Sequence, residues 1–415
     1  MHNNLTVEIE ARLPGPVIQL VRTAGRTAAR CGFNSYLVGG IVRDILLNRP
    51  PADIDIMVDG DAVRLAGEMA RQADGKLTIH KAFGTATFKL GNCRVDLSTC
   101  RGETYDRPGA LPKVKPGDIR QDLFRRDFSI NALAICINPG RFGLLIDYYG
   151  GSQDLADKLI RISHAKSFQD DATRIMRAVR YEQRLDFKLE HNTLKLLRRD
   201  LEMLDTISSD RLKREVLLWL GEAGPGKIVR RASQMGILPK LHPALKWNRP
   251  MQVAFSRSAA CNAAGTPVIT YFCLLVFQLG EDALYELLLR LNLLGSRYDL
   301  LSYQGLALKE KQAMLDNPSI KNSELYFLLR DTDPAVLQAV WLYPNPSMVR
   351  KNLHLFLTKL RHVKTLLTGN NLTMLGIKPG PQVGAILKKM LTARLDGLIK
   401  TRADEEKLAR RLAGI

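Results

Sequence analysis

The strongest constraint on the fold is a change of hydrophobic pattern close to residue 150. Up to about Tyr148, short strand-like and helix-like segments alternate and are bounded by Gly, Pro and Asn. From about Gly151 onward, long segments of helical period follow one another, including residues 170–187, 209–224 and 348–367. The sequence therefore predicts an α+β fold, with a mixed β-sheet in the N-terminal region and a helical remainder.

Helix-breaking stretches divide the helical remainder further. They read "GEAGPGK", "NPSIKNS" and "GNNLTMLGIKPGPQVG". Together with the change near residue 148, they predict four parts: residues 1–148, 149–220, 221–320 and 321–415. The first part is expected to hold the sheet, and the other three are expected to be all-helical.

The charge of the chain points to a polyanionic partner. The formal net charge is +19, and residues 351–415 carry 13 Lys and Arg against 4 Asp and Glu. Such an excess suits a nucleic acid lying along the C-terminal end, although a generic basic surface is the alternative.

The sequence favours a cytoplasmic protein without a membrane span. The N-terminus "MHNNLTVEIEARLPG" has no basic segment leading into an apolar run, so no secretory signal is expected. No stretch of uncharged apolar residues is long enough to cross a bilayer. The six cysteines are scattered without CxxC pairs or histidines at zinc spacing, which favours free thiols.

The segment "DIDIMV" is the leading candidate for a metal site. Because side chains alternate along a strand, Asp53 and Asp55 are expected to share one face while Ile54 and Ile56 enter the core. Mg²⁺ prefers oxygen ligands and often combines one or two carboxylates with substrate phosphates. The alternative is an exposed face of an edge strand.

Two glycines before this segment favour phosphate binding. Gly39 and Gly40 follow an apolar strand and precede the helical segment "IVRDILLN", so their backbone N–H groups are able to approach phosphate oxygens closely. Arg43, near the start of that helix, is expected to face the same phosphates.

A third carboxylate is expected on a neighbouring strand. Residues 83–90 and 93–99 are predicted to form a β-hairpin around a Gly91-Asn92 turn, with Asp96 on its second strand. Asp96 could complete a metal cluster or deprotonate an attacking hydroxyl. A plain ion pair with Arg94 or Arg101 is the alternative.

The segment "RRDFSINALAI" combines phosphate-binding and ribose-binding residue types. Arginines, including Arg126, suit phosphate, while Asp127 and Asn131 suit ribose hydroxyls. A surface ion pair at a helix start is the alternative.

The helical run after residue 169 offers groups for reading a base. Asp171 and Arg174, spaced i, i+3, are expected on one helix face, where they would present an acceptor and donors to a base edge. An intrahelical salt bridge is the alternative. Arg177, Arg180 and Arg184 extend this face as a basic row, which would equally fit a solvated surface.

The order of six motifs identifies a family resemblance. In sequence they are "GGIVRD", "DIDIMV", "RRDFSINA", "DYYGG", "DDATR" and "SDRLKRE". With them the chain resembles the class II tRNA nucleotidyltransferases, that is, the CCA-adding enzymes and their bacterial poly(A) polymerase relatives of the polymerase β-like superfamily. The resemblance is dense over residues 36–215 and returns near the C-terminus.

This resemblance implies a fold and roles for the residues. It implies a nucleotidyltransferase head (1–148), a base-recognising neck (149–220), a body (221–320) and a tRNA-binding tail (321–415). The residues that would bind the nucleotide are Gly39, Gly40, Arg43, Arg126, Asp127, Asn131, Asp171, Arg174, Arg177 and Arg180. Asp53 and Asp55 would bind Mg²⁺, and Asp96 would be a further catalytic acid. Lys388, Lys389 and Arg394 would contact the tRNA backbone.

The implied activity is template-independent addition of CCA, or part of it, to tRNA from CTP and ATP by two-metal nucleotidyl transfer. The segment from Gly102 to Phe124 corresponds to the flexible loop of the family, and its full length favours an enzyme able to add the terminal A. Its wording "RPGALPKV" departs from typical CCA-adding members, so an A-adding enzyme working beside a partner enzyme stays open. A poly(A) polymerase, a CC-adding enzyme and an inactive RNA-binding relative stay open as well.

Two motifs depart from the usual family wording. The family often has Glu-Asp where this chain has Asp170-Asp171, and Glu-Arg where this chain has Asp210-Arg211. The first change leaves the base-reading Asp171 in place.

Overall fold

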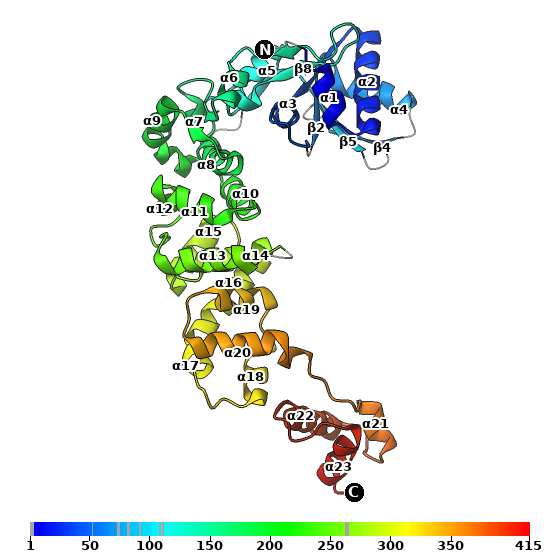
Figure 1. Cartoon of the computed structure of the whole chain (residues 1–415), viewed down its shortest axis with the longest axis vertical. Coiled ribbons are helices and arrows are strands. Elements are labelled where there is room, and N and C mark those ends of the chain that lie inside the picture. Colours follow the sequence, from blue (N-terminus) through cyan, green and yellow to red (C-terminus); the bar gives the residue numbers. More distant parts are fainter. Residues whose placement is uncertain are drawn as a thin grey trace. The chain divides into compact units, whose positions relative to one another are not determined.

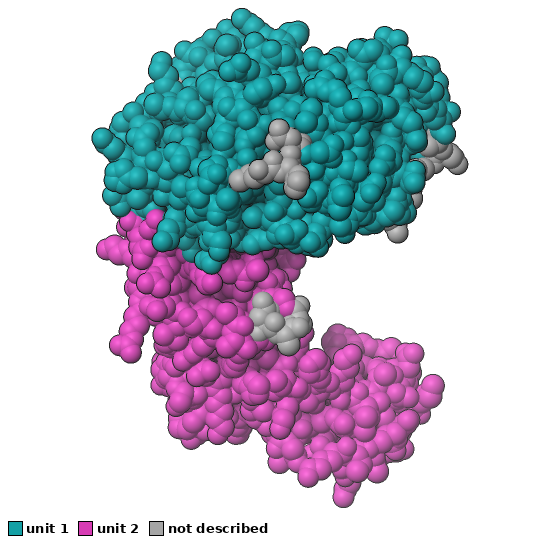
Figure 2. Space-filling view, turned by 45° about the horizontal axis from the view of Figure 1, so that its top comes forward, with its two compact units in different colours: residues 1–215, 235–240 teal, residues 216–234, 241–415 magenta. Residues whose placement is uncertain are grey.

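The computed structural model describes residues 4–51, 53–72, 75–80, 84–90, 93–107, 109, 112–261 and 265–415. The chain divides into two compact units, residues 1–215 with 235–240 and residues 216–234 with 241–415 (Figure 2). This division is coarser than the four predicted parts. The boundaries at residues 148, 220 and 320 therefore stay a prediction.

A seven-stranded mixed sheet forms the centre of the first unit, with the order β3–β4–β5–β2–β1–β8–β9. Strands β2 and β5 are parallel, and the other neighbours are antiparallel. The strands are β1 (Asn34–Val38), β2 (Ile54–Asp59), β3 (Lys76–His80), β4 (Thr85–Leu90), β5 (Cys93–Thr99), β8 (Ala134–Cys136) and β9 (Leu145–Ile146). The antiparallel pairing of β4 with β5 confirms the predicted hairpin, whose residues 81–83 and 91–92 lie outside the described residues.

Besides the sheet, the first unit contains helices and short 3₁₀ segments. They are α1 (Thr6–Arg12), α2 (Gly15–Arg30), α3 (Gly40–Leu46), α4 (Ala62–Gln72), α5 (Ile119–Phe124), α6 (Gly151–Ala156), α7 (Ser167–Asp170), α8 (Thr173–Leu185), α9 (His191–Arg199), η2 (Ser129–Asn131) and η3 (Leu201–Thr206). Helices α2 and α4 pack against each other and against β1 and β4 (Figure 1). Their apolar stripes, which include Leu20 and Leu65, are buried there.

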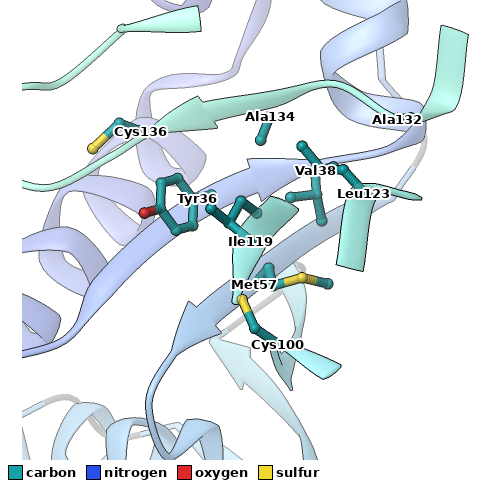
Figure 3. Close-up of a cluster of buried hydrophobic side chains, with 9 residues drawn as sticks. All are labelled: Tyr36, Val38, Met57, Cys100, Ile119, Leu123, Ala132, Ala134 and Cys136. Carbon is teal, nitrogen blue, oxygen red and sulfur yellow. The ribbon is translucent and has the colours of Figure 1, made fainter. Parts of the chain in front are cut away.

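A cluster of buried side chains packs on the opposite face of the sheet. It shows to which face the side chain of Asp55 points. Tyr36, Val38 and Met57 from the sheet pack there against Ile119 and Leu123 of α5 (Figure 3). Because side chains alternate along a strand, Asp55 points to the same face as Met57, while Ile56 is buried on the other face. The carboxylate of Asp55 therefore lies on the face that α5 covers.

The structure departs from the sequence predictions at three places. Residues 170–187 are not one helix, since the chain is extended at Asp171 between α7 and α8. The segment expected as a flexible loop forms a hairpin of β6 (Arg101–Thr104) and β7 (Lys113–Pro116), followed by α5. The neck is not purely helical either, because β10 (Leu159–Ile160) and β11 (Lys188–Leu189) form a short parallel pair.

The second unit is helical, as predicted. Helix α10 (Ser209–Leu220) leads into it, and α12 (Ile237–Leu241) spans the point after residue 240 where the chain returns to it. The other elements are α11 (Pro225–Gln234), α13 (Arg249–Cys261), α14 (Val268–Val276), α15 (Glu281–Arg290), α16 (Arg297–Glu310), α17 (Gln312–Leu315), α18 (Asn322–Leu329), α19 (Pro334–Leu342), α20 (Ser347–Thr358), η4 (Leu360–His362), α21 (Gly369–Met374), α22 (Pro381–Leu395) and α23 (Arg402–Ala413). Among the described helices, none has the length and apolar character needed to cross a membrane.

The last three helices of the second unit share a small core. Leu372 of α21, Ile386 and Met390 of α22 and Ala409 of α23 are buried together. Arg394 of α22 donates to the fully buried carboxylate of Glu405, 2.9 Å away, and so ties α22 to α23. The α21–α23 segment is thus held by packing and by an internal ion pair.

Candidate active site

A cavity of about 530 Å³ in the first unit collects most of the predicted site residues. Those that line it are Gly39, Gly40, Arg43, Asp53, Asp55, Arg126, Asp127, Asn131, Asp171, Arg174 and Arg177. Seven arginines and six carboxylates contribute to the lining, so the cavity is a dense array of opposite charges. Most of these cations are positioned by neighbouring carboxylates or carbonyls, which fixes their geometry.

The turn after β1 has no room for a side chain. Gly39 has φ +73°, which disfavours other residues, and a Cβ there would lie 2.7 Å from the Nη1 atom of Arg126. Gly40 begins α3, and both glycines line the cavity at this point. The glycines expected from the sequence thus allow a guanidinium to approach the backbone directly.

Arg43 is buried and fixed on two sides. Its Nε donates to Asp44 at 2.9 Å, and its Nη1 donates to the Oδ1 of Asn131 at 2.8 Å. The guanidinium also lies over the ring of Tyr181, 5.5 Å from the centroid. A cation held in this way keeps its position before any ligand arrives.

The two aspartates lie side by side at the start of β2. Asp53 immediately precedes the strand and is exposed, whereas Asp55 lies within it and is half-buried. Burial raises the pKa of Asp55, nearby Arg126 opposes the rise, and the carboxylates of Asp96 and Asp53 add to it. The pair therefore concentrates negative charge that the protein only partly balances.

Asp53 and Asp55 fit a divalent cation. In the described part of the chain, neither carboxylate has a hydrogen-bond or ion-pair partner, so their oxygens are available. Two carboxylates are enough for Mg²⁺, which usually completes its shell with water and substrate phosphates. No group of three or more His, Cys, Asp or Glu side chains suited to a metal occurs among the described residues.

Asp96 lies directly opposite Asp55 in the parallel pairing of β2 with β5, but it is engaged elsewhere. Its carboxylate accepts from Thr87 Oγ1 at 2.6 Å and forms an ion pair with Arg94 at 2.9 Å. It is absent from the described lining of the cavity. The observed contact is thus the Arg94 ion pair, and a catalytic role for Asp96 stays a prediction.

Asp127 and Asn131 form a connected network under the cavity. Asp127 accepts from Asn131 Nδ2 at 3.0 Å and from Arg177 Nε at 2.9 Å. Burial alone would raise the pKa of Asp127, but attraction to Arg177 and the hydrogen bond from Asn131 outweigh it, so this pKa is lowered. The network runs from Arg43 through Asn131 and Asp127 to Arg177, and it connects α3, η2 and α8.

Arg126 and its neighbour Arg125 share one buried acid. The carboxylate of Asp122 is fully buried and accepts from Arg125 Nη2 at 2.7 Å and from Arg126 Nη2 at 3.2 Å. Asp122 also accepts from the backbone N–H of Arg101 at 3.4 Å. One side chain of α5 therefore positions two cavity arginines and the first residue of β6.

Asp171 and Arg174 both line the cavity, but not as residues of one helix. Asp171 precedes α8, and its carboxylate accepts from the backbone N–H of Thr173 at 2.9 Å and from Arg211 Nη2 at 2.6 Å. Arg174 is buried and donates to Ser167 Oγ and to the carbonyl of Arg125, both at 2.6 Å. Within the described residues the two side chains form no salt bridge with each other, and each is held by different partners.

Arg177 and Arg180 of the basic row on α8 are engaged with carboxylates, whereas Arg184 is exposed. Attraction to Asp127 is the main cause that raises the pKa of Arg177, which also lies 3.7 Å from Glu215. Arg180 is buried beside Glu215 at 3.3 Å and is not part of the cavity lining, whereas Arg184 is. Burial raises the pKa of Glu215, and Arg180 and Arg177 offset this only in part.

Several lining residues did not emerge as site candidates from the sequence. Glu103 and Tyr105 come from the hairpin expected as a loop, and the Tyr105 hydroxyl donates to Glu103 at 2.9 Å. Burial raises the pKa of Tyr105, and the adjacent Glu103 carboxylate adds to the rise. Asp44 lies inside the motif "GGIVRD", and Arg211 lies inside "SDRLKRE". Both residues could therefore have been predicted as site residues from these motifs.

The predicted RNA-binding residues all lie on α22 of the second unit. Lys388 and Lys389 are exposed, and the Lys388 ammonium lies over the ring of Phe327 at 5.3 Å. Arg394 is instead engaged with Glu405 and with the carbonyl of Lys400. The two lysines are thus the accessible cations of this group.

Comparisons with known proteins give the family. The Poly A polymerase head domain matches residues 35–161. The A-adding tRNA nucleotidyltransferase of Geobacter sulfurreducens is 35% identical over 97% of this chain, which spans only 48% of that relative. The enzyme of the same name from Halalkalibacterium halodurans is 31% identical over 98% of this chain and 95% of its own length. The chain belongs to the class II tRNA nucleotidyltransferase family.

A solved structure agrees with this assignment. The Thermotoga maritima CCA-adding enzyme complexed with tRNA matches with a TM-score of 0.79 and 28% identity, covering 98% of each chain. The chain thus spans about half the length of the Geobacter relative but nearly all of the Halalkalibacterium and Thermotoga proteins.

Proposed function

We propose that the chain adds the 3′-terminal CCA, or part of it, to tRNA from CTP and ATP without a nucleic-acid template, releasing pyrophosphate. The observation that carries this proposal is that the glycine turn, the Asp53 and Asp55 pair and the Asp171 and Arg174 pair meet in one cavity. Family membership and the tRNA-bound neighbour support tRNA as the acceptor.

The cavity binds the incoming nucleotide through positions that are fixed in advance. Arg43 and Arg126 lie beside the glycine turn, where they offset the charge of a triphosphate. Asn131 and Asp127 face the cavity as polar partners for ribose hydroxyls. Because these side chains are already held by hydrogen bonds, little reorganisation is needed when the nucleotide binds.

Asp53 and Asp55 would hold Mg²⁺. When bound there, the ion supplies charge stabilisation for phosphate oxygens and acidifies a coordinated hydroxyl. In the reaction the 3′-hydroxyl oxygen forms a bond to the α-phosphorus, the bond to pyrophosphate breaks and its electron pair leaves with pyrophosphate, and the hydroxyl proton passes to water. The protein contributes position and charge, and no covalent intermediate with a side chain is required.

Base selection rests on Asp171 and Arg174. A carboxylate acceptor next to guanidinium donors matches the donor and acceptor pattern on the pairing edge of a pyrimidine or purine base. Ser167 and the carbonyl of Arg125 orient Arg174, while Thr173 and Arg211 orient Asp171. The two side chains that read the base edge are thus oriented by hydrogen bonds to neighbouring residues.

The exposed lysines of α22 bind the tRNA backbone by charge, without reading its sequence. A cytoplasmic location fits a tRNA-processing role and belongs to the same proposal.

The test is to offer tRNA lacking CCA, tRNA ending in CC and complete tRNA, with CTP and ATP singly and together, and to sequence the products. Addition of CC followed by one A supports the proposal. Absence of any incorporation in the presence of Mg²⁺ would overturn it. Continued extension with ATP alone would instead indicate a poly(A) polymerase.

A second candidate is an enzyme that adds only the terminal A. The relatives from Geobacter sulfurreducens and Halalkalibacterium halodurans, which match nearly all of this chain, carry the name A-adding. This candidate predicts incorporation of one A into tRNA ending in CC and no use of CTP, and a partner enzyme would then supply the two C residues.

A further inference from the structure

A second cavity, of about 580 Å³, adjoins the candidate active site in the first unit. It lies between the β6–β7 hairpin, α5 and Tyr149, and its lining includes Lys115, Arg120 and Phe124. Glu103 and Arg125 line both cavities and form an ion pair of 3.0 Å. This pair of side chains is therefore a wall common to both cavities.

The second cavity has an aromatic surface made of Phe124 and Tyr149, and both rings are held in place by neighbouring residues. The ring of Phe124 stacks on that of His164, with centroids 4.9 Å apart and planes at 25°, and it lies 5.6 Å from the ring of Tyr149. Tyr149 is held by its hydroxyl, which donates to the carbonyl of Arg120 at 2.9 Å. Phe124 nevertheless remains 43% exposed, so part of this aromatic residue is accessible to solvent.

The charge around this aromatic surface is positive. Lys115, Arg120 and Arg125 line the cavity against the single carboxylate of Glu103, which is already paired with Arg101 and Arg125. Within the described ranges, no carboxylate lies at ion-pair distance from Lys115 or Arg120. Arg120 also lies over the exposed ring of Tyr148, 5.5 Å from its centroid.

Open aromatic faces beside unpaired cations are typical of sites for single-stranded nucleic acid, where bases stack on the rings and cations follow the backbone. An apolar peptide would gain nothing from Lys115 and Arg120. The wall shared with the nucleotide cavity further favours a strand that continues from the reaction centre.

We propose that this second cavity binds one base of the single-stranded RNA next to the 3′ end, stacked on Phe124, with its phosphates beside Lys115 and Arg120. The proposal rests on the proposed function, because it takes the RNA acceptor as the ligand. It assigns to Phe124 a positioning role: holding the strand while its end reaches the neighbouring cavity.

The test uses the full chain and a hairpin RNA with a single-stranded 3′ extension, in which 2-aminopurine replaces each extension nucleotide in turn. Stacking on an aromatic ring quenches this fluorophore. We expect one position to be quenched on binding to the wild type, with the quenching lost in Phe124→Ala and kept in Phe124→Tyr. RNA binding by Phe124→Ala should be about tenfold weaker, since one stacked base is lost.

Two controls separate stacking from general damage. Tyr285→Ala removes an aromatic side chain of similar exposure, 49%, from the second unit and should leave the quenching unchanged. An abasic site at the quenched position should remove the affinity difference between wild type and Phe124→Ala, because both changes delete the same contact.

Equal quenching in the wild type and Phe124→Ala would overturn this assignment, as would an affinity difference that persists with the abasic RNA. A wild type that adds nucleotides normally while showing either result refutes only the second cavity. A wild type that neither binds the RNA nor incorporates nucleotides refutes the proposed function as well.

Discussion

The arginines of the cavity differ from the two exposed lysines of α22 in how they are held. In the cavity, Arg43, Arg174 and Arg177 are each fixed by partners at 2.5–2.9 Å, and Arg43 and Arg174 are buried. On α22, Lys388 and Lys389 are exposed at the ends of long flexible side chains. Both regions suit phosphate, yet only the first has a defined geometry.

This difference agrees with what each region is proposed to bind. A nucleotide must be placed within a fraction of an ångström of the reacting hydroxyl, so its cations need internal acids to hold them. An RNA backbone presents charge over a long distance, and mobile ammonium groups are sufficient for it. Substitutions in the cavity should therefore affect turnover, while those on α22 should affect affinity.

The largest effect is expected from Asp55→Asn. Removing one of the two carboxylates proposed to bind Mg²⁺ should lower kcat at least about a thousandfold, since a bound metal contributes several kcal/mol to the transition state. RNA binding, measured by filter retention, should persist. The control is Asp331→Asn, which changes a carboxylate whose side chain is 84% exposed in the second unit. Full activity in Asp55→Asn would contradict the metal assignment.

Arg177→Met should have the next largest effect. It leaves the buried Asp127 carboxylate without its main partner, which should lower kcat about a hundredfold and the free energy of unfolding by about 2 kcal/mol. The double variant Arg177→Met with Asp127→Asn removes the unpaired charge as well. It should recover stability in thermal unfolding but not activity. If activity returned too, the network would matter for folding alone.

Arg211→Met is expected to change selectivity. Asp171 would lose its 2.6 Å partner and keep Thr173, so the carboxylate proposed to read the base would be less well directed. The preference for the correct nucleotide over its competitor, measured as a ratio of kcat/KM values, should fall about tenfold. An unchanged ratio would show that Thr173 alone directs Asp171.

The combined variant Lys388→Ala and Lys389→Ala should have a smaller effect, confined to affinity. RNA binding should weaken a few-fold, and the salt dependence of the affinity should become shallower by about one to two units of slope. Lys76→Ala, on exposed β3 of the first unit, serves as the matched control. A salt slope equal to that of the wild type would remove these lysines from the RNA contact.

The smallest effect is expected at acid pH. Because the pKa of Asp127 is lowered in the folded protein, its carboxylate stabilises the fold above the unfolded pKa of about 3.9, and this contribution is lost as the pH falls through the folded value. The melting temperature of the wild type should therefore fall more steeply than that of Asp127→Asn between about pH 6 and about pH 3. Parallel curves would contradict the lowered pKa.

An element of the fold can be predicted from the sequence when the residues that form it lie close together along the chain. The β4–β5 hairpin follows from alternation close in sequence, and the structure confirms it. The strands β10 and β11 are two residues each and pair across 29 positions, so no local period reveals them. The β6–β7 hairpin pairs Arg101 with Pro116 without an apolar alternation, so the sequence indicates only a loop there.

The candidate site shows the same dependence. Asp53, Asp55 and Gly39 are evident from short motifs, and they lie together in the cavity. The sequence places Asp171 inside a helix, but its carboxylate binds the N–H of Thr173 and so ends the helical run locally. Arg180 has the spacing of a basic face, yet it is buried beside Glu215, which lies 35 positions further along the chain and which no local spacing reveals.

Asp122 has a wider consequence for how this protein is able to change. One carboxylate orients Arg125, Arg126 and the backbone where β6 begins, and through Arg125 it also supports the pair that separates the two cavities. Even Asp122→Glu, a change of one methylene, would shift all of these parts at once. Asp122 therefore supports residues that line both cavities, so a change at this one position would alter the two cavities together.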